Sequence, residues 1–429
     1  MTAYPRFVAA SGLTNLADGV AVVAWAWVAS LLTRDALLIS LVPVALRLPW
    51  FVFALPVGVI TDRVDRRRLI VAMDVVRGSA FAVAALAIWL ALPLAPAPAV
   101  GMANPGLFGL ICTAALVVGV AEVFRDNAAQ TMLPALVPLA GLERANGRLW
   151  SVELVANSLL GPVSGAFLIA LWLPLPFVLN VAAYGGAAVL LARIAGQFRP
   201  ARSATRNWRA ELGEGFAFLR AAPLLQTLAW TTGFWNLFHQ MVMIALVLHV
   251  QENFELEARA YGLMLAGGAV GGVAGSLLGP WIAQKLGATR TMQWMLAASP
   301  LAFAAIALAP GPVAAGVALG VMELTGLTWN IVSVSTRQRM IPDGLLGRVN
   351  SLYRLMAWGM MPVGLILSGL IVRSGEGLVA RNVALILPLW VAAAGALVLV
   401  AVAWPALRHG FASTAQPANP VENSADTRV

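Results

Sequence analysis

Residues 58–68 form a short charged segment between two long apolar ones. The segment reads GVITDRVDRRR and carries four arginines and two aspartates. The flanking residues 38–57 and 69–92 contain only three charged side chains between them. A hydrocarbon core needs about 20 apolar residues per helical span, and arginine-rich loops stay on the cytoplasmic side. The segment therefore predicts a tight cytoplasmic turn between two membrane-spanning helices.

The composition of the whole chain supports a membrane protein. Of 429 residues, 60% are hydrophobic and 11% are charged, whereas a soluble domain is about a quarter charged. The net charge of +9 comes from arginines in loops. These arginines form no continuous basic face, which argues against a nucleic-acid partner. The single cysteine, Cys112, excludes an intramolecular disulfide.

Apolar segments separated by charged loops predict an all-α integral membrane protein with twelve transmembrane helices. The expected spans are residues 7–33, 38–60, 69–92, 107–132, 146–170, 174–194, 224–250, 259–283, 291–309, 312–335, 351–372 and 382–404. With the amino terminus in the cytoplasm, most arginines fall in cytoplasmic loops. Both termini are then cytoplasmic, and the protein is expected in the inner (plasma) membrane.

An internal repeat divides the chain into two parts. Asn15-Leu16 recurs as Asn236-Leu237, and the pattern Gln-x-Met-x-Pro occurs at 130–134 and again at 338–342. Parallel repeats of this kind are found in transporters whose substrate site lies between two halves. We expect pseudo-symmetric six-helix halves at 1–195 and 223–410. Between them, 196–222 is expected to be a cytoplasmic linker with a helix on the membrane surface, and 411–429 a disordered cytoplasmic tail.

The charged segment also resembles the loop motif of the major facilitator superfamily. Gly58, Asp62, Arg63, Arg66 and Arg67 fall on the motif, whereas Asp65 stands where glycine is usual. Residues 211–225 and 342–348 are similar to a branch that includes enterobactin exporters and macrolide efflux proteins. The resemblance implies secondary active transport by alternating access.

In this family the loop forms a cytoplasmic gate, with its Asp near the eleventh helix and an Arg meeting a carboxylate on the fourth. By position, Arg66 and Asp126 are the matching pair. The candidate gate residues are Gly58, Asp62, Arg63, Arg66, Arg67, Arg125, Asp126 and Glu153, and Asp74 and Arg77 map to the same cytoplasmic half.

Three carboxylates fall deep inside predicted spans: Asp18, Glu122 and Glu323. Ionisable residues at this depth are costly, and they often bind transported protons. A salt bridge or an interhelical hydrogen bond is the alternative reading. It is stronger for Glu122, because Arg125 follows at i+3. Arg47 is placed to pair with Asp18 or to contact an anionic substrate.

Polar and aromatic residues in the first, second, seventh, tenth and eleventh predicted spans are candidates for a substrate cavity, which needs apolar surface and a few polar anchors. They are Asn15, Arg47, Trp235, Asn236, His239, Gln240, Asn330 and Trp358. Contact with lipid or with neighbouring helices is the alternative for the aromatic residues.

The fifth span contains Gly161-Pro162 and Gly165, which resemble the core of an antiporter motif. Its outer glycines are replaced by Asn157 and Ala166. Because proline removes a backbone hydrogen bond and glycine permits close contact, a kinked packing helix is the alternative.

Nothing in the sequence supports enzymatic chemistry, a metal site or a cofactor. There is no phosphate-binding loop with lysine, and the three histidines are scattered. Taken with the deep carboxylates, the resemblance implies a proton-coupled exporter (antiporter) of an organic small molecule such as a drug or siderophore. Its partners would be the substrate, protons and the lipid bilayer, and it would function as a monomer. A proton-coupled uptake symporter and a non-transporting membrane scaffold or sensor are the alternatives.

Overall fold

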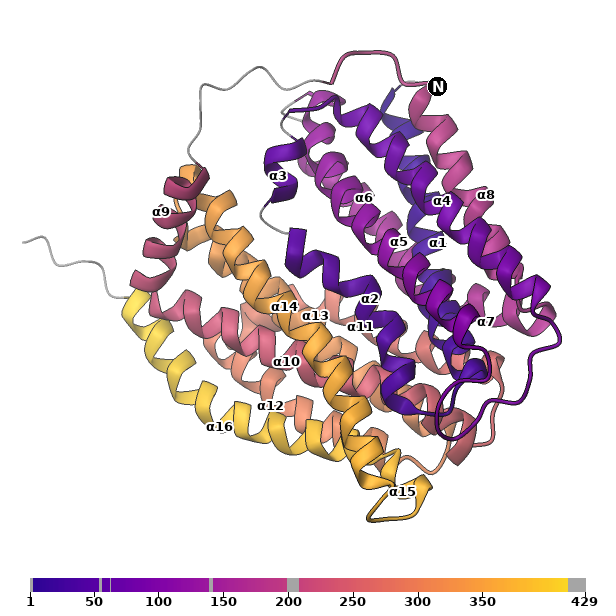
Figure 1. Ribbon diagram of the computed structural model, residues 1–429. Helices are drawn as coiled ribbons and strands as arrows, with labels where there is room; N and C mark the ends of the chain where they lie inside the picture. Colours follow the sequence, from indigo (N-terminus) through magenta and orange to yellow (C-terminus); the bar gives the residue numbers. More distant parts are fainter. Residues whose placement is uncertain (1–2, 54–55, 62, 139–141, 199–207, 416–429) are drawn as a thin grey trace, which may run out of the picture.

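The computed structural model of the chain describes residues 3–53, 56–61, 63–138, 142–198 and 208–415 (Figure 1). All regular structure in these residues is helical. The N-terminal helices are α1 (Ala3–Leu32), α2 (Ala36–Phe53), α3 (Pro56–Thr61), α4 (Arg66–Leu90), α5 (Pro105–Met132), η1 (Leu133–Ala135), α6 (Leu142–Glu153), the π-helical segment η3 (Leu154–Leu160), α7 (Gly161–Leu171) and α8 (Leu175–Ala192). The C-terminal helices, which follow α9 (Trp208–Ala221), are α10 (Pro223–Leu248), the π-helical turn η4 (His249–Asn253), α11 (Ala258–Leu286), α12 (Ala288–Ala307), α13 (Pro312–Met340), α14 (Asp343–Gly375), α15 (Arg381–Ala384) and α16 (Leu387–Ala415).

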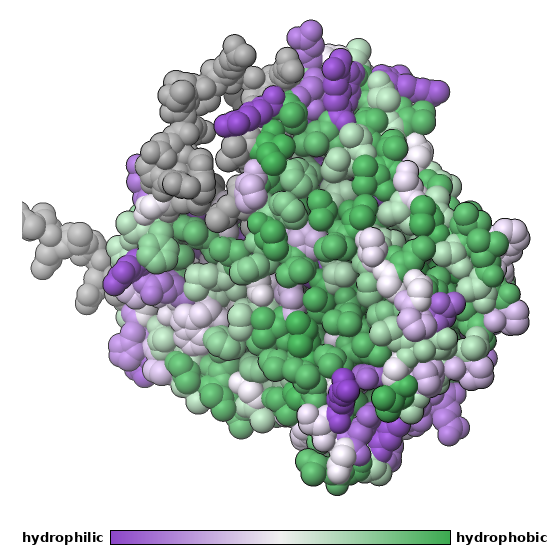
Figure 2. All heavy atoms as spheres, viewed as in Figure 1, coloured by the Kyte–Doolittle hydropathy of each residue, from purple (hydrophilic) through white to green (hydrophobic). Residues whose placement is uncertain are grey.

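Each predicted span coincides with helical structure. Within the described residues, eleven helical segments are long and apolar enough to cross a membrane. The segment predicted at 291–309 forms α12, a helix of 20 residues that is not among these eleven. On the face seen in Figure 2, hydrophobic residues cover the middle of the molecule and hydrophilic residues gather toward its ends, as a bilayer-spanning protein requires.

Several helix boundaries differ from the prediction. The predicted helix 38–60 ends at Phe53 as α2, and α3 is separate. The span predicted at 146–170 consists of α6, η3 and α7. Helix α14 begins at Asp343 instead of 351, and α16 continues to Ala415, which makes residues 411–415 helical and not part of a disordered tail. The length of an apolar segment shows which part of a helix lies in the hydrocarbon core. The helix itself can continue through charged residues beyond that core.

The N-terminal helices pack mainly on one another, and so do the C-terminal helices. Helix α4 lies between α5 and α8, and α1 contacts α7 and α8. In the C-terminal group α11 packs along α13, and α10 lies against α14 and α16. The two groups meet chiefly where α2 contacts α14 and where α7 contacts α11. Helix α9 packs on α14, with Arg348 bonded to Glu214, and its placement on a membrane surface stays a prediction.

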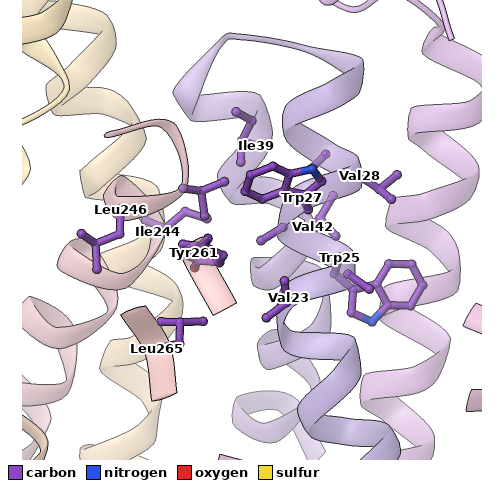
Figure 3. Close-up of a cluster of buried hydrophobic side chains, with 14 of the residues drawn as sticks. Val23, Trp25, Trp27, Val28, Ile39, Val42, Ile244, Leu246, Tyr261 and Leu265 are labelled. Carbon is purple, nitrogen blue, oxygen red and sulfur yellow. The ribbon is translucent and has the colours of Figure 1, made fainter. Parts of the chain in front are cut away.

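A buried apolar cluster joins α1 and α2 to α10 and α11 (Figure 3). Trp27 of α1 faces Tyr261 of α11, with ring centroids 5.9 Å apart. Ile39 and Leu246 are almost fully buried in the same cluster. The cluster lies in the half of these helices that the charge pattern places toward the outside, and it closes the space between the two groups there.

Candidate functional site

A cavity of about 620 Å³ lies between the two helix groups. Helices α1, α2, α5 and α6 with η3 supply most of its wall, and α14 supplies the rest. It extends from Trp25, in the last third of α1, to Phe7, Leu133 and Leu149 at the end of the molecule that is predicted to be cytoplasmic. Its polar and charged lining consists of Ser11, Asn15, Asp18, Arg47, Glu122, Arg125, Asp126, Gln130, Glu153, Asn157 and Arg354.

Asp18 is held by a cation and a phenol on neighbouring helices. Its Oδ1 accepts hydrogen bonds from Tyr184 Oη at 2.6 Å and from Arg77 Nη2. Arg77 of α4 is fully buried, and it also donates to Tyr184 Oη at 2.9 Å. The partner of Asp18 is therefore Arg77. Of the two alternatives for Arg47, pairing with Asp18 is wrong, because Arg47 lies 3.7 Å from Glu122.

Arg125 is the centre of a second charged cluster on α5. Its Nε lies 3.5 Å from the buried carboxylate of Asp74, its Nη1 lies 3.2 Å from Asp126, and its Nη2 donates to Thr14 Oγ1 at 2.7 Å. Arg125 thus links α1, α4 and α5, and the ion pair of Glu122 is with Arg47 instead.

Arg66, which we expected to meet Asp126, donates from Nη1 to the backbone carbonyl of Thr131 at 2.7 Å. The cation that contacts Asp126 is Arg125. Arg67 binds the carbonyl of Ile194, and Arg63 is exposed. Gly58 lies in α3, whereas Asp62 lies outside the described residues. The loop arginines thus bind the ends of α5 and α8, which belong to their own helix group.

Asp65, the departure from the loop motif, caps helix α4. Its Oδ1 accepts from the backbone N–H of Arg68 at 2.9 Å, and its Oδ2 from that of Phe198 at 3.2 Å. Burial alone would raise the pKa of Asp65, but these two N–H groups and the charges on Arg67 and Arg68 outweigh it and lower the pKa. An aspartate before an apolar helix is a helix N-cap signal, which sequence analysis did not use here.

Glu153 and Arg354 differ from the other charged residues of the cavity. Glu153 is exposed to the cavity, and no ion pair connects it to another described residue. The guanidinium of Arg354 lies 5.3 Å from the ring of Trp358, one turn further along α14. Trp358 in turn packs edge-on against Trp50 of α2, with ring centroids 5.2 Å apart. The two tryptophans come from different helix groups and form an aromatic wall of the cavity.

Of the eight residues predicted for a substrate cavity, Asn15, Arg47 and Trp358 line this one. Asn15 is nearly buried and donates to the Ser11 carbonyl at 2.9 Å. Asn236 donates to the Ala357 carbonyl at 2.9 Å, so it joins α10 to α14. Gln240 is partly buried and Asn330 is exposed, and neither lines the cavity.

Trp235, His239 and Glu323 form a separate polar cluster among the C-terminal helices. His239 Nε2 and Glu323 Oε1 are 2.8 Å apart, and the Trp235 ring stacks on the imidazole. Trp235 Nε1 donates to Ser299 Oγ at 2.9 Å. The predicted carboxylate Glu323 thus has a titratable partner from another helix. Among the described residues, no group of three or more Cys, His, Asp or Glu side chains is arranged to hold a metal ion.

The antiporter-like residues of α7 lie against α1. A Cβ on Gly161 would come within 2.5 Å of Gly19 Cα, and one on Gly165 within 2.7 Å of the Val20 carbonyl oxygen. Pro162, whose missing N–H cannot join the α-helical hydrogen-bond pattern, lies two residues after the end of the π-helical η3. A close, irregular helix contact is therefore present, and an exporter-specific role for it stays a prediction.

A group of polar residues at the opposite end of the molecule links the two helix groups, and we call it the outer cluster. Arg381 donates to Glu252 Oε2 at 2.6 Å, to Glu376, and to the backbone carbonyl of Arg34 at 2.7 Å. Arg34 also binds Gln251, which donates to Ser30 Oγ at 2.7 Å. The outer cluster consists of Arg34, Asp35, Gln251, Glu252, Arg373, Glu376 and Arg381. Sequence analysis used these charges only to orient the chain.

Comparison with known proteins agrees with this architecture. The sequence model for transmembrane secretion effectors matches residues 2–427. The chain belongs to this family, within the major facilitator superfamily. It is 28% identical over 416 residues to the multidrug efflux pump Tap of Mycolicibacterium fortuitum, covering 91% of this chain and 93% of Tap. This transmembrane secretion effector is therefore a multi-pass membrane transporter and not an enzyme.

Solved structures of transporters share the fold of this family member. A bacterial homologue of the iron transporter ferroportin, in its inward-facing state, superposes with a TM-score of 0.73 at 16% identity, covering 94% of this chain and 98% of that one. A mutant of the nucleoside transporter NupG gives a TM-score of 0.75 at 12% identity, covering 94% of this chain and 100% of that one.

Proposed function

We propose that this chain is a proton-coupled exporter of an organic small molecule such as a drug or siderophore. It would work by alternating access between two six-helix halves, and α12 would be one of the twelve spans. The protein would lie in the inner membrane, with both termini in the cytoplasm. The observation that carries the proposal is the charged, tryptophan-lined cavity between the two helix groups. The similarity to a multidrug efflux pump supports the outward direction.

The two ends of the cavity differ as one state of an alternating-access cycle requires. At one end, the outer cluster and the Trp27–Tyr261 contact hold the two helix groups together. At the other end, the cavity reaches Phe7 and Leu133, which the arginine distribution assigns to the cytoplasm. These contacts support an inward-facing state, in which an exporter takes up its cargo.

The cavity suits a molecule of drug size. Pockets for such ligands usually measure about 300–1,000 Å³ and combine apolar walls with a few polar groups. Trp50 and Trp358 supply aromatic surface, and Arg47, Glu122 and Glu153 supply charges of both signs nearby. Because both helix groups contribute to the wall, a bound molecule would respond to their relative movement.

The first test is the susceptibility of a bacterial strain lacking its own exporters to a panel of drugs and siderophores, with and without this protein. Export predicts resistance to at least one compound and reduced accumulation of it in the cell. Glu122→Gln should abolish that resistance, whereas Glu257→Gln, on an exposed residue outside the cavity, should keep it at equal membrane abundance. Inward accumulation of a metabolite would instead identify an uptake symporter, and intact folding without flux of any compound would indicate a scaffold.

A further inference from the structure

His239 and Glu323 form a hydrogen-bonded pair in the middle of two helices. His239 of α10 lies roughly 24 Å along its helix from Pro223, and Glu323 of α13 lies roughly 17 Å from Pro312, at 1.5 Å per residue. Their Nε2 and Oε1 atoms are 2.8 Å apart. The pair is therefore at mid-depth in the membrane, and it connects two helices of the C-terminal group.

The pair is partly accessible. The exposed fractions of its side chains are 19% for His239 and 25% for Glu323. An ionisable group at this depth is strongly disfavoured against hydrocarbon and faces the interior of the bundle or a water-filled space. Helix α11 packs closely beside the carboxylate, because a Cβ on Gly268 would lie 3.5 Å from Glu323 Cγ. On this argument the exposed part of the pair faces a space inside the bundle and not the lipid.

Asp18 differs from Glu323 in the partner that it binds. It neutralises Arg77, which is completely buried and permanently charged. Protonating Asp18 would leave this guanidinium without its counter-ion in a low-dielectric interior, which is a large penalty. The partner of Glu323 is a histidine, which can itself be neutral. The His239–Glu323 pair can therefore gain or lose a proton without leaving a permanent charge unpaired.

The other charged and titratable groups on the helices packed around the pair either have partners elsewhere or lie near helix ends. Helices α10 and α13 contact α1, α2, α9, α11, α12, α14 and α16. On these elements the recorded partners are Arg77 for Asp18, Glu122 for Arg47, Glu214 for Arg348, Phe167 for Arg259, Trp27 for Tyr261, Asn350 and Tyr353 for Arg337, Trp358 for Arg354, and Asp35 for Arg373. Lys285, Arg290, Arg339, Arg408 and His409 lie near helix ends. Within the described part of the chain, no third charged side chain contacts His239 or Glu323.

We propose that His239 and Glu323 together bind the proton that drives transport, and that Asp18 is a fixed charge that organises α1, α4 and α8. This inference rests on the proposed function, which supplies the proton coupling, and it assigns that coupling to one pair. A proton taken up from the outside is held between the imidazole and the carboxylate, and it leaves to the cytoplasm when the two helix groups adopt the inward-facing state. His239 is accordingly a proton ligand and not a substrate contact.

Proton binding can be measured without any substrate, because the chain has only three histidines. Protein purified in detergent with isotope-labelled histidine should give three imidazole signals in nuclear magnetic resonance, assigned with His249→Gln and His409→Gln. We expect the His239 signal to respond to pH between 5 and 9 and its response to change in Glu323→Gln. A His239 signal that stays constant over this range would overturn the proposal, whatever the protein transports.

Transport by reconstituted protein then separates the pair from Asp18, with the compound found in the susceptibility panel as the probe. Glu323→Gln and His239→Gln should lose flux driven by a pH gradient at least about tenfold and keep flux down the gradient of the compound. Asp18→Asn should lower both fluxes together, and His409→Gln should lower neither. Driven flux retained in Glu323→Gln but selectively lost in Asp18→Asn would assign the proton to Asp18. If wild-type flux does not depend on the pH gradient, the proposed function is wrong. The pH dependence of the His239 signal still decides whether the pair binds a proton.

Discussion

Arg381 donates from Nη2 to the backbone carbonyl of Arg34 at 2.7 Å and thereby ties the loop after α1 to the start of α15. The same guanidinium contacts both carboxylate oxygens of Glu252, at 2.6 and 3.0 Å. Hydrogen bonds to charged groups each contribute roughly 1.5–3 kcal/mol. One arginine thus connects the two helix groups at the end where the cavity is closed.

Removing this arginine should open the outer end. In a Cys112→Ser background, Ser30→Cys places a thiol at a fully buried position beneath the outer cluster. We expect Arg381→Ala to increase labelling of this thiol by a membrane-impermeant maleimide about tenfold, which corresponds to about 1.4 kcal/mol. The control is Arg373→Ala, because Arg373 lies 3.9 Å from Asp35 and is 57% exposed. Such a pair contributes little. Equal labelling in both variants would contradict a latch centred on Arg381.

Trp358 should determine how well aromatic compounds bind. It packs on Trp50 across the cavity, and an aromatic contact contributes about 0.5–1.5 kcal/mol beyond its buried area. Trp358→Ala should therefore raise the KM for an aromatic substrate several-fold, measured by efflux from vesicles. Trp281→Ala is the matched control, because Trp281 is 59% exposed and lies outside the cavity. A purely structural role would lower the amount of folded protein and leave KM unchanged.

Asp65 should make stability depend on pH in the acidic range. Its pKa in the folded protein is lowered from the ordinary 3.8. The ionised form therefore contributes stability well above pH 3.8, and this contribution is lost as the pH falls through 3.8 to the lowered pKa. Thermal unfolding in detergent should show a cost of about 0.5–2 kcal/mol for Asp65→Ala at pH 7. This difference should shrink as the pH approaches 3, and a difference that stays constant would argue against the cap.

Helix α11 should not tolerate a side chain at Gly271. A Cβ there would overlap the backbone of Gly320 on α13, and Gly267 and Gly275 approach the same helix closely. We expect Gly271→Ala to separate α11 from α13 and to reduce the amount of monodisperse protein severely, as size-exclusion chromatography can measure. Gly185→Ala adds the same methyl group to α8 where nothing lies within 4 Å. It should behave like wild type, and similar losses in both variants would refute the packing argument.

Sequence alone predicted where helices occur but not how intramembrane charges are paired. Spans follow from long segments without charge between arginine-rich loops, because hydrocarbon excludes charge. Pairing depends on which helix faces cross. Asp18 and Arg77 are 59 positions apart, and they meet only because α1 and α4 both lie against α8. Arg125 lies at i+3 from Glu122, yet it reaches Asp74 on another helix. For the Asp18–Arg77 pair, the available sequence signal was a single acidic residue in one predicted span and a single basic residue in another.

The outer cluster escaped sequence analysis for a related reason. Its residues come from segments at 34–35, 251–252 and 373–381 near the ends of helices, which are far apart in the chain and unremarkable in composition. The packing of α2 on α14 brings the first and third of these segments together. The histidine partner of Glu323 was equally hidden, because α10 and α13 are separated by two helices in sequence.

Arg77 and Asp18 provide the sharpest test of a structural charge pair. Asp18→Asn leaves a fully buried guanidinium without a counter-ion, and breaking a buried pair on one side costs about 3–5 kcal/mol. Arg77→Gln should cost less, because Asp18 keeps the Tyr184 hydrogen bond at 2.6 Å and 24% exposure. The double variant should be more stable than Asp18→Asn alone, since it removes both charges together. Thermal unfolding of the four proteins in detergent measures this coupling, and additive losses would show that the two residues act independently.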